Sequence, residues 1–164
     1  MLRDWARRAG TAEGPAVAGR MAALADGAAR GLEPERDRAC LLAHRDLHGA
    51  QLLWDVRAGL ALLDLDTLAL ADPALDLGNL LAHVDLAVSQ RRWAPHRAAA
   101  PVAAVARVAD ALGIAPARVE RWRLAAAVRV ALVHRVRPRG RAWAGRELVR
   151  LERRLADDGL LGRR

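Results

Sequence analysis

The chain has no lysine, no phenylalanine and no tyrosine, and only one cysteine. Because all its basic side chains are arginines, a nucleotide site that needs a lysine on the β- and γ-phosphates is incomplete in these 164 residues. Cys40 alone forms neither an intrachain disulfide nor a cysteine zinc site. Since Leu41 and Leu42 follow it, we expect a short buried run and an inert thiol. The scarcity of aromatic residues leaves a core of Leu, Val and Ala, which favours helices.

Long apolar runs are also missing. No uncharged stretch approaches the length of a membrane span, and the first residues lack the apolar core of a signal peptide. These absences predict a cytoplasmic protein with no membrane partner. The net charge is +8, and arginines crowd the segment 135–154. Because Glu147 and Glu152 interleave with them at helical spacings, we interpret this segment as a solvated helix face and expect no nucleic acid partner.

The apolar pattern predicts a mainly α fold with one small β-hairpin. In the segment 12–30, apolar residues repeat at helical spacing: Val17, Met21, Leu24 and Ala28. Further helices are predicted over 97–112, 116–136 and 142–156, with 116–136 central because it is apolar nearly all round. The segments 51–54 and 60–63 flank a turn that contains Gly59, which predicts the hairpin. The charged segment 33–39 is expected to be exposed.

One more helix is expected to begin at Asp72-Pro73. An aspartate at the N-cap accepts a backbone N–H bond, and a proline in the first turn lacks a donor that would have no partner there. The apolar stripe of this helix is predicted to be Leu77, Leu80, Leu81 and Val84. With 164 residues, of which 53% are hydrophobic, the chain suits a single domain over 1–164. We divide it into leading helices (1–39), a central segment (40–86) and a helical bundle (87–164).

The central segment carries three motifs in order. Residues 44–51 are HRDLHGAQ, residues 60–66 are LALLDLD and residues 72–79 are DPALDLGN. This succession resembles the catalytic loop, metal-binding strand end and following helix of the aminoglycoside phosphotransferase and choline kinase-like families, which have a protein-kinase-like fold. The resemblance covers roughly residues 41–84. It implies the C-terminal lobe of a small-molecule kinase that uses ATP and Mg²⁺, and a hydroxyl compound as acceptor.

Phosphoryl transfer to an alcohol needs a carboxylate that orients the hydroxyl and accepts its proton, and a metal that neutralises the phosphates. Asp46 is the expected base and Asp64 the expected Mg²⁺ ligand, with Gln51 and Asp66 as further ligands. If the strand before Asp64 continued, Asp64 and Asp66 would share a face. The resemblance also implies that His44 braces the loop.

Two carboxylates are assigned to support. Asp72 is expected to be an N-cap, and the resemblance implies that Asp76 ties the following helix to the loop. His83 and His134 lie in predicted helices and are interpreted as ordinary core or surface residues.

The chain departs from the family pattern in two respects. Gln51 stands where the family has Asn, and no lysine-bearing N-terminal β lobe precedes the loop in these residues. A separate or upstream lobe is therefore an expected partner. Two alternatives stay open: a non-catalytic kinase-like remnant that binds a partner, and a metal hydrolase that uses His44, Asp46 and His48.

Overall fold

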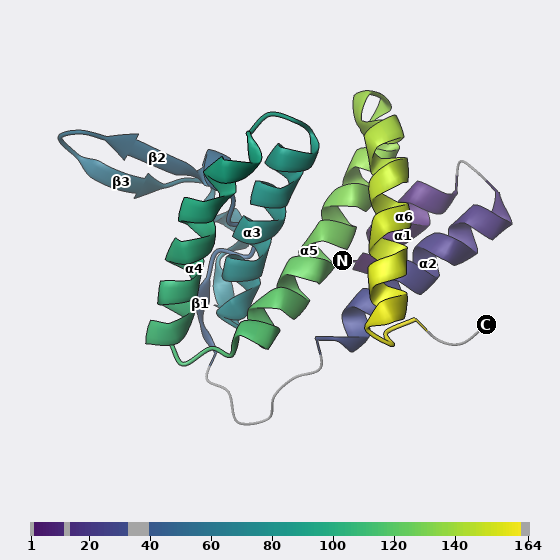
Figure 1. Cartoon of the computed structure of the whole chain (residues 1–164), viewed down its shortest axis with the longest axis horizontal. Coiled ribbons are helices and arrows are strands. Elements are labelled where there is room, and N and C mark those ends of the chain that lie inside the picture. Colours follow the sequence, from purple (N-terminus) through teal and green to yellow (C-terminus); the bar gives the residue numbers. More distant parts are fainter. Residues whose placement is uncertain (1, 12–13, 33–39, 162–164) are drawn as a thin grey trace. The chain divides into compact units, whose positions relative to one another are not determined.

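The computed structural model describes residues 2–11, 14–32 and 40–161, and it confirms a mainly helical fold with a small amount of β structure. The chain forms two compact units (Figure 1). The terminal unit comprises residues 1–34 and 124–164, and the central unit comprises residues 35–123. Whether the chain behaves as the single domain expected from its length stays a prediction.

The terminal unit is built from helices. They are α1 (Leu2–Gly10), α2 (Pro15–Arg30), the end of α5 (Pro116–Val136), the short 3₁₀ turn η4 (Pro138–Gly140) and α6 (Arg141–Asp157). The helices pack around large, fully buried side chains, namely Leu24, Val128, Leu132, Leu148, Leu151 and Leu155. The apolar faces predicted for the helices that became α2 and α6 therefore lie in this core. Arg20 of α2 donates two hydrogen bonds to Glu152 of α6, at 3.0 and 2.6 Å.

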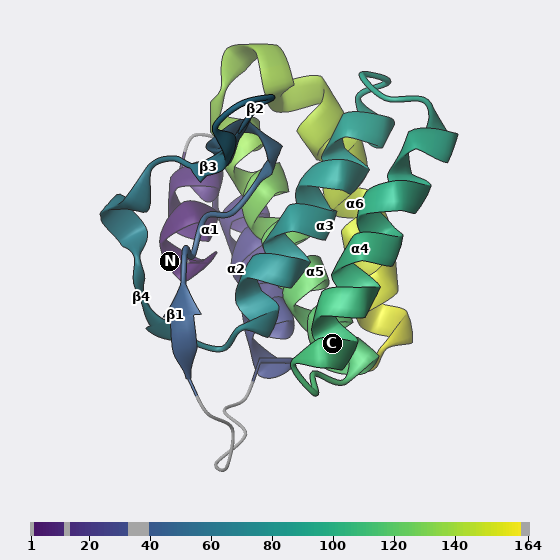
Figure 2. The same ribbon diagram turned by 90° about the vertical axis from the view of Figure 1, so that its left-hand side faces the viewer.

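The central unit combines two strand pairs with helices. β1 (Leu41–Ala43) pairs antiparallel with β4 (Ala69–Ala71), and β2 (Leu52–Asp55) pairs antiparallel with β3 (Gly59–Leu62) (Figure 2). The β2–β3 hairpin confirms the prediction and projects away from α3 (Ala74–Ser89) and α4 (Ala99–Ala111) (Figure 1). The core contains Ala74, Leu77, Leu81, Val105, Ala109, Ile114 and Val119. Four helix predictions thus match α3, α4, α5 and α6 within a few residues.

Three expectations about the chain need correction or comment. Cys40 is exposed, and Leu41 and Leu42 are 41% and 66% exposed, so the run that they form is not buried. The β1–β4 ladder is three residues long and two strands wide, which is too small to bury side chains on both of its faces. Leading helices were expected over 1–39, but the bounds of α1 were not predicted, although its apolar residues repeat at helical spacing. Segment 33–39 and residues 12–13 lie outside the described residues.

The start of α3 is fixed by Asp72. Its Oδ1 accepts the N–H of Ala74 at 2.9 Å, but the helix begins at Ala74 and its N-cap is Pro73, so Asp72 lies one residue before the N-cap and not at the N-cap as predicted. Its Oδ2 accepts hydrogen bonds from Arg118 Nε at 2.7 Å and Trp122 Nε1 at 3.0 Å. Arg118 is only 5% exposed, and the Asp72 carboxylate offsets the cost of burying its guanidinium charge. Asp72 therefore joins the first turn of α3 to α5.

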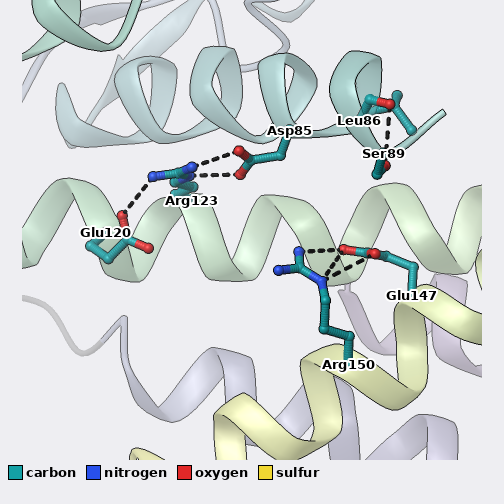
Figure 3. Close-up of polar contacts among 7 residues, drawn as sticks. All are labelled: Asp85, Leu86, Ser89, Glu120, Arg123, Glu147 and Arg150. Carbon is teal, nitrogen blue, oxygen red and sulfur yellow. Dashed lines mark hydrogen bonds and ion pairs between the residues drawn. The ribbon is translucent and has the colours of Figure 1, made fainter. Parts of the chain in front are cut away.

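A second contact between α3 and α5 depends on a glycine. A Cβ added to Gly78 would lie 2.5 Å from both the Arg123 backbone nitrogen and Trp122 Cβ. On the same two helices, Arg123 donates hydrogen bonds to both oxygens of Asp85, at 2.7 and 2.6 Å, and one to Glu120 at 3.3 Å (Figure 3). Hydrogen bonding to Asp85 is the main reason why the pKa of Arg123 is raised. Close backbone approach and ion pairing thus hold these helices together.

Replacing Gly78 tests this close approach. Gly78→Ala should lower the free energy of unfolding by about 1–3 kcal/mol, because the backbone of α5 would have to move. The matched control is Gly19→Ala in α2, where a Cβ meets no atom within 4 Å. This control should raise the stability by about 0.5–1 kcal/mol. Urea unfolding of both variants measures the difference, and equal effects would contradict the packing described.

Replacing Asp72 tests the buried ion pair. Burial by itself would raise the pKa of Asp72, but hydrogen bonds from Trp122, Ala74 and Arg118, with the charge of Arg118, lower it below 3.8 overall. A lowered pKa in the folded state contributes stability above pH 3.8, which is lost as the pH falls through the folded-state pKa. Asp72→Asn should therefore unfold more easily at neutral pH and lose less stability on acidification below about pH 4. Urea unfolding from pH 7 to pH 3 measures both effects.

The control for the Asp72 experiment is Asp157→Asn. This residue is exposed at the end of α6, and its replacement removes the same charge. An identical pH profile for Asp72→Asn and Asp157→Asn would show that the contacts of Asp72 contribute nothing specific.

Candidate functional site

The loop that carries Asp46 is attached to the first turn of α3 through Asp76. Asp76 Oδ2 accepts the N–H of His44 at 2.6 Å, and Oδ1 accepts the N–H of Arg45 at 2.8 Å. Arg45 has a φ of 68°, in the left-handed region. Successive N–H groups around such a residue can converge on one anion. This carboxylate therefore fixes the backbone of the two residues that precede Asp46.

His44 connects this loop to the chain segment before Asp64. Its ring is buried, with 3% of the residue exposed, and its Nε2 lies 2.7 Å from the carbonyl oxygen of Leu63. Its Nδ1 accepts the backbone N–H of Asp46 at 3.4 Å. These two contacts together assign the proton to Nε2, which donates to Leu63. Thr67 Oγ1 donates to the carbonyl oxygen of His44 at 2.6 Å, so both the ring and the backbone of His44 are held.

Gln51 and Asp64 are brought together by the β2–β3 hairpin. The N–H of Leu63 donates to the carbonyl oxygen of Gln51 at 2.9 Å, next to the last pair of the ladder. Gln51 Nε2 donates to Asp64 Oδ2 at 3.1 Å. Asp64 itself has φ 57° and ψ 62°, a left-handed conformation that aspartate tolerates better than most residues. The two side chains are thus neighbours although thirteen positions separate them.

This pair suits a hard cation. Mg²⁺ is commonly held by one or two carboxylates together with the phosphates of a substrate, and it requires oxygen ligands. Asp64 is exposed and supplies a carboxylate. Rotating the amide group of Gln51 by 180° places its oxygen where its nitrogen now lies. The residues present therefore fit a magnesium ion that a phosphate group would help to bind.

Asp66 does not extend this pair along a strand. β3 ends at Leu62, and Asp66 lies in the 3₁₀ turn η2 (Leu65–Thr67), so the condition for a shared strand face is not met. The left-handed conformation of Asp64 breaks the extended backbone at this point. Within residues 2–11, 14–32 and 40–161, no three His, Cys, Asp or Glu side chains are grouped to hold a metal ion. In the metal hydrolase alternative His44 would be a ligand, and here both of its ring nitrogens are hydrogen-bonded.

Two further residues support the loop and were not identified from the sequence. Asn79, buried on α3, donates from Nδ2 to the carbonyl oxygen of Leu47 at 2.8 Å. His83 of α3 stacks on His48, with ring centroids 4.6 Å apart and an interplanar angle of 29°. A polar residue between Leu77 and Leu81 on the buried stripe was the available signal for Asn79. Asp46 is half-buried, and its backbone N–H donates to His44.

Changing Asp76 tests the attachment of the loop. In Asp76→Asn an NH₂ group replaces one of the two accepting oxygens and faces a backbone N–H, so one hydrogen bond is lost. The variant should lose about 1–3 kcal/mol of stability. The amides of His44 and Arg45 should exchange with deuterium faster, whereas the core of the terminal unit should keep its protection. Hydrogen exchange with Asp110→Asn as the charge-matched control measures this, because Asp110 is exposed on α4. Unchanged exchange at residues 44–46 would contradict the role of the carboxylate.

The fold and site were compared with known proteins in three ways. A scan against family models, a search of curated proteins and a search of solved structures each found no match. No helix in the described ranges is both long enough and apolar enough to cross a membrane.

Proposed function

We propose that the chain is the C-terminal lobe of a small-molecule kinase of the aminoglycoside phosphotransferase and choline kinase-like type, with a protein-kinase-like fold. The reaction is transfer of the γ-phosphoryl group of ATP to a hydroxyl group of a small molecule, and Mg²⁺ is the cofactor. The part that binds most of the nucleotide is a separate or upstream lysine-bearing lobe.

One observation carries this proposal: three sequence motifs with the family spacing are linked by hydrogen bonds. Asp76 of the third motif binds the backbone of the first. His44 of the first motif binds the carbonyl oxygen of Leu63 in the second, and Gln51 binds Asp64. A chance resemblance over three short strings gives no reason for such mutual contacts. The contacts support a common site.

In the proposed mechanism, Asp46 accepts the proton of the acceptor hydroxyl and orients its oxygen. The loop backbone needs a fixed position for this, which the bonds from Asp76 and His44 supply. Asp64 and Gln51 are the residues that would hold Mg²⁺. When bound, this ion would neutralise charge on the phosphates. Gln51 is one methylene longer than the family Asn, and its amide contacts Asp64 at 3.1 Å.

A second candidate function is favoured by the exposed apolar side chains of the hairpin. Leu53, Trp54 and Leu60 are 56%, 71% and 64% exposed. Large exposed apolar groups that lie close together commonly mark a binding surface. A non-catalytic kinase-like module that binds a partner through β2 and β3 would use this surface and need neither Asp46 nor Asp64. The two functions therefore differ in their dependence on the carboxylates.

Manganese binding tests the proposed metal pair on the 164-residue chain. Mn²⁺ titration followed by electron paramagnetic resonance, with ADP present, should give an affinity that falls by at least about tenfold in Asp64→Asn. Asp66→Asn is the matched control and should change the affinity little, because Asp66 lies in the next turn. Gln51→Asn should retain the oxygen ligand. Equal affinities of the wild type and Asp64→Asn would contradict the assignment.

Phosphoryl transfer itself is tested with the chain joined to the protein segment encoded directly upstream of residue 1. Transfer of ³²P from ATP to a panel of hydroxyl compounds should fall about 10²–10⁴-fold in Asp46→Asn. The chain alone should bind Mg-ATP weakly. Tight, Mg²⁺-dependent binding by the chain alone would overturn that part of the proposal. Transfer that is indifferent to Asp46 would favour the non-catalytic alternative.

A further inference from the structure

The net positive charge of the protein lies in one of its two units. The central segment 35–123 contains 11 arginines and 11 acidic residues, whereas segments 1–34 and 124–164 together contain 16 arginines and 8 acidic residues. The whole net charge of +8 therefore belongs to the terminal unit. No acidic residue occurs from Arg121 to Arg146. A general preference for arginine codons does not explain this, because it would enrich both units.

The structure arranges part of this charge as a line along α6. Arg146, Arg150 and Arg153 are exposed at positions i, i+4 and i+7, which lie on one side of a helix. Arg139, seven residues before Arg146, is exposed in the turn η4 that leads into α6. We call these four residues the arginine ridge. From Arg146 to Arg153 the ridge runs about 10 Å along the helix axis.

The acidic residues of α6 neutralise only one member of the ridge, Arg150. Glu147 pairs with Arg150 one turn away, at 2.6 Å (Figure 3). Glu152 accepts two hydrogen bonds from Arg20 of α2. Among the residues that the structure describes, Arg139, Arg146 and Arg153 have no acidic side chain within ion-pair distance. The interleaving of Glu147 and Glu152 with the arginines therefore leaves three ridge arginines without an acidic partner among the described residues.

We infer that the arginine ridge is a binding surface for the phosphate backbone of double-stranded nucleic acid, without sequence preference. Arginines on one side of a helix suit a linear polyanion, since duplex DNA carries one negative charge per about 1.7 Å of its axis. Arginine forms bidentate hydrogen bonds with phosphate. The side chains between the arginines include Ala142 and Gly145, which are small and leave the guanidinium groups accessible.

An anionic membrane fits the ridge less well. A helix that lies in a membrane surface inserts a broad apolar face between the lipids. The apolar face of α6, which contains Leu148, Leu151 and Leu155, is buried in the core of the terminal unit. On the side of α6 that carries the ridge, the apolar side chain of Val149 is only 37% exposed. The ridge therefore offers charge without a surface that can insert. This inference is independent of the phosphotransferase proposal, because no ridge residue lies in segment 40–86.

The test is binding of the full chain to a fluorescent, random-sequence DNA duplex of about 20 base pairs, followed by polarisation at several salt concentrations. The ridge variant is Arg139→Gln/Arg146→Gln/Arg153→Gln. Removing three phosphate contacts should weaken binding at about 50 mM salt by at least tenfold and make the slope of log K against log salt shallower by roughly 2–3. Glutamine preserves helix propensity, and circular dichroism should confirm that the variant folds.

The control variant is Arg97→Gln/Arg107→Gln/Arg121→Gln. These three arginines are exposed in helical segments of the central unit, and their replacement lowers the net charge equally. The control should bind DNA nearly as tightly as the wild type. Equal weakening by both triple variants, or displacement of DNA by polyglutamate at equal charge concentration, would overturn the inference in favour of non-specific attraction. Tighter ridge-dependent binding to phosphatidylserine vesicles than to DNA would overturn it in favour of a membrane.

Discussion

The carboxylate of Asp76 is the contact on which the central segment depends. It accepts the N–H groups of His44 and Arg45, so two donors that would otherwise lack partners are satisfied by one side chain. It also connects a loop to a helix that begins some thirty residues later. With Asp76 in place, the ring of His44 reaches the carbonyl oxygen of Leu63. The loop, the hairpin and α3 are then linked by a chain of hydrogen bonds in which each link fixes the next.

Asp72 has a related but separate task. It accepts the N–H of Ala74 at the start of α3 and also holds the buried charge of Arg118. A buried guanidinium without a carboxylate is strongly unfavourable, so this pair constrains which parts of α3 and α5 face each other. Gly78 allows the same two helices to approach closely. The expected N-cap is thus also a tertiary contact, which the motif alone did not reveal.

Much of the local structure follows from periodicity and turn chemistry. Apolar residues at helical spacing predicted α2, α3 and α6, and two apolar runs around a turn with Gly59 predicted the β2–β3 hairpin. Sequence reasoning failed where local pattern was weak. The pairing of β1 with β4 joins three-residue strands that are far apart in sequence. The bounds of α1 were missed although its apolar residues repeat at helical spacing. Burial of Cys40 was predicted wrongly, because apolar neighbours do not reveal whether a second layer covers a strand.

The candidate site shows the same division. The sequence by itself determined the order and spacing of the motifs, the absence of lysine, and which side chains offer oxygen ligands, since these are properties of the chain alone. Only the tertiary structure decided that Gln51 meets Asp64, that Asp66 turns into η2, and that Asn79 supports the loop. It also decided that the net charge is confined to one unit. The physical reason is that hydrogen bonds, ion pairs and exposed surfaces depend on distances in space, which sequence spacing fixes only within a helix or a tight turn.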